Sequence, residues 1–269
     1  MRYRYLKDPH PHLVIDQIVA PETYRAMRFP DERLEPGASW GLTSGDPQYA
    51  EVLRDPLWKA LHDQLRGPAF VSAVLQCFAD DMRAARCLVD PDRTRSSSYV
   101  ESRVEKEQPT LAPDGDPNEV FTRLDFQSKG TGAYREFVHL DWARRVIGGI
   151  LFFCDADEEG LVGGETAFYR DRAFRDDRWC HDPELATSFG ARPNTGVIFL
   201  NSNTGFHRPR PIAALQGRRR WLYYTISSRV DIWPCSPRPA VRHPPADRRD
   251  AGSVGRCAER SGGMVGRAR

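Results

Sequence analysis

Several features that would assign this chain to a common class of protein are missing from it. No apolar run approaches the roughly 18 residues that a membrane span needs. The opening segment, MRYRYLKDPHPH, lacks the charged-then-apolar pattern of a secretory signal. The six cysteines form no Cys-x-x-Cys pair, which argues against a zinc ribbon or a thioredoxin-type motif. We therefore expect a cytoplasmic protein with reduced cysteines and no membrane partner.

An excess of one charge is also missing. The chain carries 39 Lys and Arg against 37 Asp and Glu, a net charge of +2. No basic stripe is interleaved with the aromatic side chains that stack on bases, so we expect no nucleic-acid partner. What is present is ordinary for a globular protein: 269 residues, 40% hydrophobic and 28% charged. This length suits one domain, or one domain with a tail.

The residue pattern and composition of the sequence change twice along the chain. An alternating apolar run near residue 13 predicts a strand, and helical spacing of apolar residues follows within about 20–105. From about 120 to 230 the chain consists of short β-branched and aromatic runs separated by Gly, Asn, Asp or Pro. After that, Pro, Arg, Gly and Ser dominate. The sequence thus predicts one domain over 1–233 and a disordered tail over 234–269.

The short runs between 120 and 230 predict the fold class. Their spacing is typical of an all-β sandwich or barrel, because parallel α/β order would need helical segments between them. Only residues 170–190 leave room for such a helix. We expect a mainly β protein with supporting helices placed towards the N-terminus.

The sharpest chemical feature is His139-Leu140-Asp141. Residues i and i+2 of a strand point to the same face, so this histidine and carboxylate can bind one metal ion together. His207 is the best third ligand, because it follows the buried-strand run GVIFLN (196–201) after a short polar turn. Two histidines and one carboxylate leave positions open for further ligands, which suits non-haem Fe(II).

A second feature is the run GRRRW at 217–221, where arginines begin an otherwise bulky strand. Its middle arginine, Arg219, follows His207 closely along the chain. One inward-facing arginine in an aromatic-lined barrel could bind a carboxylate through its two-pronged guanidinium group. Successive side chains of a strand lie on opposite faces, so Arg219 and Arg220 point in opposite directions. Alternation alone does not show which of the two faces inward.

Taken in order, HLD, GGET (163–166), GVIFLN, FH (206–207) and GRRRW resemble the 2-oxoglutarate- and Fe(II)-dependent dioxygenases. The prolyl-hydroxylase-like bacterial branch is the closest in texture, and the resemblance spans about residues 10–230. It implies a double-stranded β-helix, which is a jelly-roll core like that of the cupins. It implies Fe(II) held by His139, Asp141 and His207, with the far carboxylate of 2-oxoglutarate on Arg219, or on Arg220 as the second choice.

The implied reaction uses O₂ and decarboxylates 2-oxoglutarate to succinate while a substrate is hydroxylated. Asp141 favours hydroxylation over halogenation, since halogenases of this family lack that carboxylate. By analogy, the substrate is a small molecule, either an intermediate of natural product biosynthesis or an amino acid. Thr166, from GGET, and Trp142, beside the metal strand, are the candidate substrate contacts.

Two other classes of function remain as alternatives. A cupin-like metal-dependent hydrolase or isomerase would use the same metal ligands and ignore 2-oxoglutarate. A non-catalytic jelly-roll binding module would need no metal at all. The remaining histidines lack a matching strand context, and we expect them on the surface: His10, His12, His62, His181 and His243.

Overall fold

A computed structural model describes residues 1–31, 39–107, 112, 114–130, 137–173, 178–214 and 216–234, apart from the side chains of 39, 40, 106 and 107. Residues 1–236 form one compact unit. The predicted tail over 234–269 lies outside the described residues except for Pro234, so both the tail and the boundary at residue 233 stay predictions. None of the helices among the described residues is long and apolar enough to cross a bilayer.

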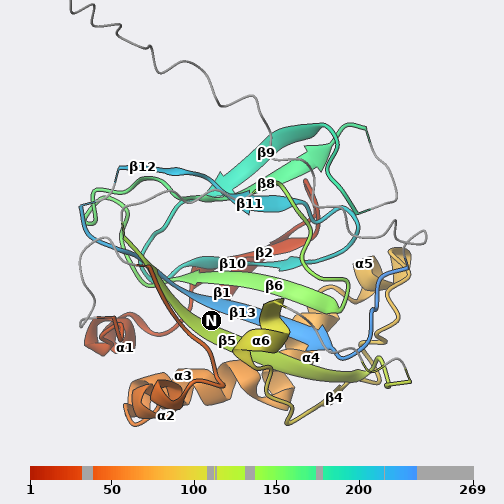
Figure 1. The fold of residues 1–269 in the computed structure, drawn as a ribbon, viewed down its shortest axis with the longest axis horizontal. Helices are drawn as coiled ribbons and strands as arrows, with labels where there is room; N and C mark the ends of the chain where they lie inside the picture. Colours follow the sequence, from red (N-terminus) through yellow and green to blue (C-terminus); the bar gives the residue numbers. More distant parts are fainter. Residues whose placement is uncertain are drawn as a thin grey trace, which may run out of the picture. The chain divides into compact units, whose positions relative to one another are not determined.

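A large, mainly antiparallel sheet forms the body of the domain (Figure 1). Its strand order is β1-β2-β10-β6-β13-β5-β3, with β4 paired in parallel to β5. The neighbours in this order come from distant parts of the chain, so the sheet is held together by long-range pairing. The strands are β1 (Arg2–Leu6), β2 (His12–Gln17), β3 (Ser39–Leu42), β4 (Arg95–Ser96), β5 (Glu119–Lys129), β6 (Arg145–Phe152), β10 (Gly196–Leu200) and β13 (Arg219–Ser228).

A smaller sheet lies against one face of the large one (Figure 1). Its order is β11-β8-β9, and a separate pair joins β12 to β7. These strands are β7 (Val162–Gly163), β8 (Thr166–Asp171), β9 (Pro183–Phe189), β11 (His207–Pro209) and β12 (Ile212–Ala214). From β6 onwards the chain passes repeatedly from one sheet to the other. This is jelly-roll topology, and the predicted mainly β fold is confirmed.

Helices α2 (Pro47–Val52), α3 (Pro56–Arg66) and α4 (Pro68–Cys77) lie along the opposite face of the large sheet (Figure 1), and Met82 of α5 (Ala79–Ala84) is buried in the same core. The other helices among the described residues are α1 (Pro21–Ala26) and α6 (Arg103–Glu107), and Arg103 of α6 lines the cavity between the two sheets. The start of α3 follows from its sequence, because the Asp55 side chain accepts hydrogen bonds from the backbone of Leu57 and Trp58, and Pro56 occupies the first turn. Trp58 is then buried against the aromatic side chains of the sheet.

Alternation along β13 divides the domain into a core side and a pocket side. Leu222, Tyr224 and Ile226 are buried in the core under the helices. Arg219 and Tyr223 point the other way, into a cavity between the two sheets. The same strand therefore contributes to both the stability and the chemistry of the domain.

Three of the elements that the sequence did not predict are short strands. The strands β3 and β4 lie within the range predicted to be helical, and residues 183–189 form β9 where a helix had room. Each is a short segment that pairs along a strand already present: β3 and β4 along β5, and β9 along β8. Strand formation there depends on the partner, since the local pattern is weak.

One prediction concerns two buried tyrosines of this core. The Tyr224 hydroxyl is buried and has no hydrogen-bond partner among the described residues, whereas the Tyr49 hydroxyl donates to the carbonyl of Leu124 at 2.8 Å. Because an unpaired buried hydroxyl is costly, Tyr224→Phe should leave the free energy of unfolding unchanged or raise it by about 1 kcal/mol. Tyr49→Phe should lower it by about 1 kcal/mol. Urea denaturation would measure both, and the reverse order would contradict the assignment.

Candidate active site

The structure brings His139, Asp141 and His207 together, although Asp141 and His207 lie far apart in the sequence. His207 begins β11, and its backbone exchanges two hydrogen bonds of 3.0 Å with the backbone of His139. This isolated antiparallel bridge sets the two histidines opposite each other. One ligand atom from each of the three residues lies within 4.8 Å of the others.

Both imidazole rings are oriented by the backbone. Nδ1 of His139 lies 2.8 Å from the carbonyl of Phe137, and Nδ1 of His207 lies 3.0 Å from the carbonyl of Gly205. A carbonyl only accepts, so each Nδ1 carries the proton and each Nε2 keeps its lone pair. Nε2 of His207 then lies 3.9 Å from Oδ2 of Asp141.

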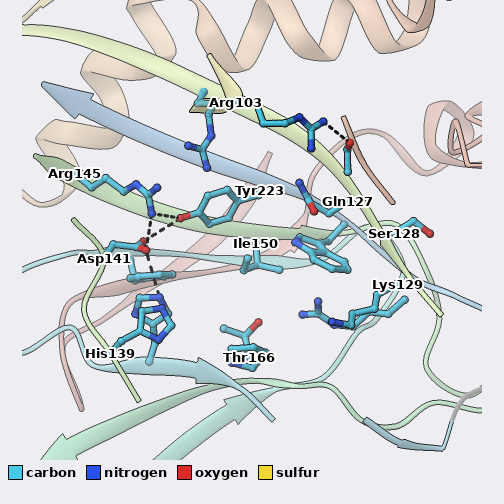
Figure 2. Close-up of a pocket in the computed structure, with 17 residues that line it drawn as sticks. Arg103, Gln127, Ser128, Lys129, His139, Asp141, Arg145, Ile150, Thr166 and Tyr223 are labelled. Atoms are coloured by element: carbon cyan, nitrogen blue, oxygen red, sulfur yellow. Dashed lines mark hydrogen bonds and ion pairs between the residues drawn. The ribbon is translucent and has the colours of Figure 1, made fainter. Parts of the chain in front are cut away.

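Two side chains hold the Asp141 carboxylate in place (Figure 2). Nη1 of Arg145 donates to its Oδ1 at 2.5 Å, and the Tyr223 hydroxyl donates to its Oδ2 at 3.1 Å. Burial alone would raise the pKa of Asp141, but the charge of Arg145 and the hydrogen bond from Tyr223 act against burial, and the pKa lies well below its usual range. The carboxylate is therefore ionised in the folded protein.

Burial has the larger effect on His207. Together with the neighbouring His139, it lowers the pKa of His207 to about 4. This imidazole is consequently neutral at physiological pH, which is the form that binds metals. The three side chains thus offer two imidazole nitrogens and one anionic oxygen.

Asn201, directly after β10, holds the turn that carries Asp141. Its Oδ1 accepts from the backbone of Asp141 at 3.0 Å, and its Nδ2 donates to the carbonyls of Trp142 and Arg145, both at 3.1 Å. The side chain is completely buried. Asn201 therefore fixes the backbone segment that carries Asp141.

The three residues line one end of a cavity of about 440 Å³. Ile150, Phe199 and Trp221 give it an apolar wall, and Thr166 of β8, a candidate substrate contact, also lines it. Trp142, the other candidate substrate contact, is 38% exposed and does not line this cavity. Trp142 was a candidate only because it follows Asp141 in the sequence. The chain turns after Asp141, so the Trp142 side chain does not line the cavity.

The register of β13 separates the two candidate arginines. Arg219 lines the cavity and lies opposite Lys129 of β5 in the sheet. Its guanidinium carbon is 4.1 Å from the centre of the Trp221 ring. Arg220 points to the other face of the strand, where its Nε lies 3.0 Å from Asp31 and its Nη1 donates to Glu159. Of the two, only Arg219 is placed to meet a ligand in the cavity.

Sequence reasoning missed several cavity residues, among them Tyr223, Gln127, Lys129 and Arg145. Tyr223 had a detectable signal, because it alternates with Arg219 on one strand face. Gln127 and Lys129 alternate in the same way on β5, but that strand carried no motif. Arg145 follows Asp141 by four residues within an arginine pair, and only the tertiary structure shows which of the pair turns towards the carboxylate.

The expectation that His10 and His12 lie on the surface is wrong. Each is 1% exposed, and both contact Phe168, with ring centres 4.3 Å and 5.2 Å away. Burial lowers the pKa of His10 to about 3. The strand β2 extends the large sheet beyond β10, and this covers side chains that a short N-terminal strand would otherwise expose. His181 is exposed as expected, His62 is partly buried, and His243 lies outside the described residues.

Gly148 provides a test of the crowding around the site. A Cβ there would lie 2.6 Å from Cζ of Phe199 and 3.3 Å from Oδ2 of Asp141. Phe199 in turn contacts His207, with ring centres 4.5 Å apart. Gly148→Ala should therefore shift a ligand and weaken Mn(II) or Fe(II) binding by about tenfold or more, as measured by calorimetric titration.

The neighbouring Gly149 is the matched control. A Cβ at that position would meet Ile198 and Tyr224, on the core side of β6. Gly149→Ala should alter the free energy of unfolding and leave metal affinity unchanged. Equal metal affinities of both variants would show that a Cβ at position 148 does not disturb the metal ligands.

Comparisons with known proteins give limited similarity. No family model and no curated protein matches the chain. Among solved structures, the chain is similar to a 2OG-Fe(II) oxygenase family protein from Burkholderia pseudomallei, with 15% identity over 66% of this chain and 61% of that one and a TM-score of 0.35. It is also similar to a prolyl 4-hydroxylase from Phytophthora capsici, with 11% identity over 70% and 47% and a TM-score of 0.36. The chain thus spans less than two thirds of the length of either protein.

A third similar structure is a prolyl hydroxylase from Trichoplax adhaerens in complex with a hypoxia inducible factor peptide fragment. It shares 7% identity over 80% of this chain and 83% of that one, with a TM-score of 0.35. These proteins belong to the group that the motifs of the sequence resemble. Because the identities and TM-scores are low, a functional assignment has to rest on the site itself.

Proposed function

We propose that this protein is a non-haem Fe(II)- and 2-oxoglutarate-dependent oxygenase that hydroxylates a small molecule. The observation that carries the proposal is the convergence of His139, Asp141 and His207 at one end of a cavity that also contains Arg219. The same cavity thus offers a metal-binding triad and a cation for a carboxylate.

The donor set fits ferrous iron. Two imidazole nitrogens and one carboxylate oxygen are the ligands of the facial triad found in non-haem iron oxygenases, and this triad leaves positions open. When bound, Fe(II) supplies the activation of O₂ that is coupled to decarboxylation of 2-oxoglutarate. Arg145 and Tyr223 hold the Asp141 carboxylate, and Asn201 holds its backbone, so that the triad is preorganised.

The cavity also fits 2-oxoglutarate, a five-carbon diacid. Tyr223, which touches Asp141, and Arg219 are four residues apart on β13, or about 13 Å of strand. The flexible Arg219 side chain can cover part of that span and bind the far carboxylate through its guanidinium fork. Lys129, opposite Arg219 in the sheet, adds a second positive charge at that end.

The remaining lining limits access of water and sets the size of the substrate. Ile150, Phe199 and Trp221 provide apolar surface beside the triad. A volume of about 440 Å³ falls within the range of about 300–1,000 Å³ typical of small-molecule sites. We further propose that the enzyme acts in the cytoplasm. Its substrate is then an intermediate of natural product biosynthesis or an amino acid. The Trichoplax structure holds a peptide, so peptides belong in a substrate screen.

Anaerobic titration of the purified protein with Fe(II) and then 2-oxoglutarate tests the proposal. Chelation of a 2-oxo acid by ferrous iron at this site should give a visible charge-transfer band that needs both components. The band should be absent in His207→Ala, and admission of O₂ should release succinate.

The two alternatives predict different results. A cupin-like hydrolase or isomerase would bind the metal without forming the band, and a binding module would bind no metal. Either result would overturn the proposed function.

A further inference from the structure

The cavity is lined by more positive than negative side chains. Arg103, Arg123, Lys129, Arg145 and Arg219 line it, and Asp141 is the acidic residue among the described lining residues. Whether any of these cations is available to a substrate depends on what already neutralises it.

Two of them are committed to buried acids. Arg145 donates to Asp141. Arg123 is 1% exposed, contacts Glu101 through its Nη1 and lies 3.1 Å from Asp125. Neither guanidinium can turn to a ligand without breaking its ion pair with a buried carboxylate, which is costly. Lys129 and Arg219 form the end of the cavity that the proposed function gives to 2-oxoglutarate.

Arg103 differs from the other four because it lies at the mouth of the cavity, with its side chain 58% exposed (Figure 2). Its Nη2 donates to the carbonyl of Gly41 at 2.9 Å and to Oδ2 of Asp46 at 2.6 Å, and its Nε lies 3.4 Å from Oδ1 of Asp46. These contacts fix the plane of the guanidinium. Its Nη1 has no hydrogen-bond partner among the described residues, so one edge stays available.

Gln127 packs beside Gly41, the residue whose carbonyl accepts from Arg103. A Cβ on Gly41 would come within 2.9 Å of Oε1 and 3.0 Å of Nε2 of Gln127, so the carboxamide packs directly on the residue whose carbonyl binds Arg103. The Gln127 carboxamide also has no hydrogen-bond partner within the described part of the chain. Figure 2 shows Arg103 and Gln127 on the same wall, facing Thr166 across the cavity.

We infer that the primary substrate carries a carboxylate, which binds to the Nη1 edge of Arg103 and to the Gln127 carboxamide at the mouth of the cavity. The rest of the substrate then extends inward towards the metal triad. A carboxylate is favoured over a phosphate, because Asp46 already offsets part of the Arg103 charge and leaves a site for a single negative charge. This inference rests on the proposed function and specifies its substrate class.

The test compares 3-phenylpropanoate with its primary amide, two probes that differ in charge and share an apolar body. Binding is measured by calorimetry in the presence of Mn(II) and N-oxalylglycine, which fill the triad and the Arg219 end. The acid should bind about tenfold more tightly than the amide, as expected for a charge-assisted hydrogen bond at a partly exposed site. Arg103→Ala should abolish this preference, and Gln127→Ala should weaken the binding of the acid.

Asp46→Asn is the matched variant, and it should act in the opposite direction. Asparagine keeps an oxygen that can accept the 2.7 Å hydrogen bond from the Thr43 backbone and removes the competing charge. The acid should then bind several-fold more tightly. A purely structural role of the Arg103–Asp46 pair would instead give two variants with the same effect on binding.

Three outcomes would overturn the inference: no binding of either probe, no preference for the acid, or a preference that survives Arg103→Ala. Tighter binding of 2-phenylethyl phosphate through Arg103 would overturn the choice of carboxylate. Failure of the proposed function is seen separately, as failure of N-oxalylglycine to bind. In that case the acid and the amide are compared in metal-free protein. A preference for the acid that is lost in Arg103→Ala would still support the inference, and a preference that survives would overturn it.

Discussion

Asp141→Ala is expected to abolish both metal binding and substrate hydroxylation. The variant removes the anionic ligand and leaves two imidazoles, and it also leaves the buried Arg145 guanidinium without the carboxylate that lies 2.5 Å away. The loss of turnover should exceed the roughly 100-fold loss that follows removal of a group that only orients a ligand. Metal affinity by titration and succinate release are the measurements.

Stability has to be controlled in this experiment, because an unpaired buried charge can cost about 3–5 kcal/mol. Asp141→Asn keeps the shape of the side chain and an oxygen that can accept from Arg145. This second variant should therefore fold normally and still fail to support turnover, since the negative charge is gone. Tyr223→Phe, which removes one hydrogen bond to the carboxylate, should reduce metal affinity about 10- to 100-fold. Hydroxylation at the normal rate in Asp141→Ala would show that the metal assignment is wrong.

Arg219→Ala is expected to raise the concentration of 2-oxoglutarate needed for half-maximal activity by about 10- to 100-fold, as fits the loss of a charge-assisted pair. Iron affinity should be unchanged, because Arg219 belongs to the opposite end of the cavity from the triad. Steady-state kinetics with varied 2-oxoglutarate and a separate metal titration would measure the two effects. Arg219→Lys should recover part of the affinity, since it restores the charge without the fork.

Arg220→Ala is the control for the strand register. Arg220 contacts Asp31 and Glu159 on the far side of β13, so its loss should lower the free energy of unfolding and leave the 2-oxoglutarate requirement unchanged. If Arg220→Ala raised that requirement and Arg219→Ala did not, Arg220 would face the cavity, and the register of β13 would be shifted by one residue.

Much of the fold was predictable from the sequence because the relevant signals are local. An alternating apolar run predicted β2, short β-branched and aromatic runs predicted β10 and β13, and the spacing of turn residues predicted a mainly β fold. The sequence predicted that the side chains at positions 139 and 141 share one face of a strand, but the structure has only an isolated bridge at His139 and no strand at Asp141, so the bridge to His207 and the hydrogen bonds to Asp141 bring the two side chains together instead. Weak segments such as β4 and β9 were missed, because they are strands only through the partners along which they pair.

The site could be predicted only in part, for the same reason. Sequence order and residue chemistry determined which histidines and which carboxylate are candidates for a metal. They could not show that Arg219 faces the cavity and Arg220 does not, because alternation gives two faces and only sheet packing gives them a direction.

The tertiary structure decided the supporting residues. Arg145, Tyr223 and Asn201 act on Asp141 from β6, β13 and the end of β10, at separations of up to 82 residues. Such contacts leave no pattern in a single sequence, because the residues are brought together only when these three strands pair in one sheet. The sequence by itself thus determined the chemical groups, and the pairing of distant strands determined their geometry.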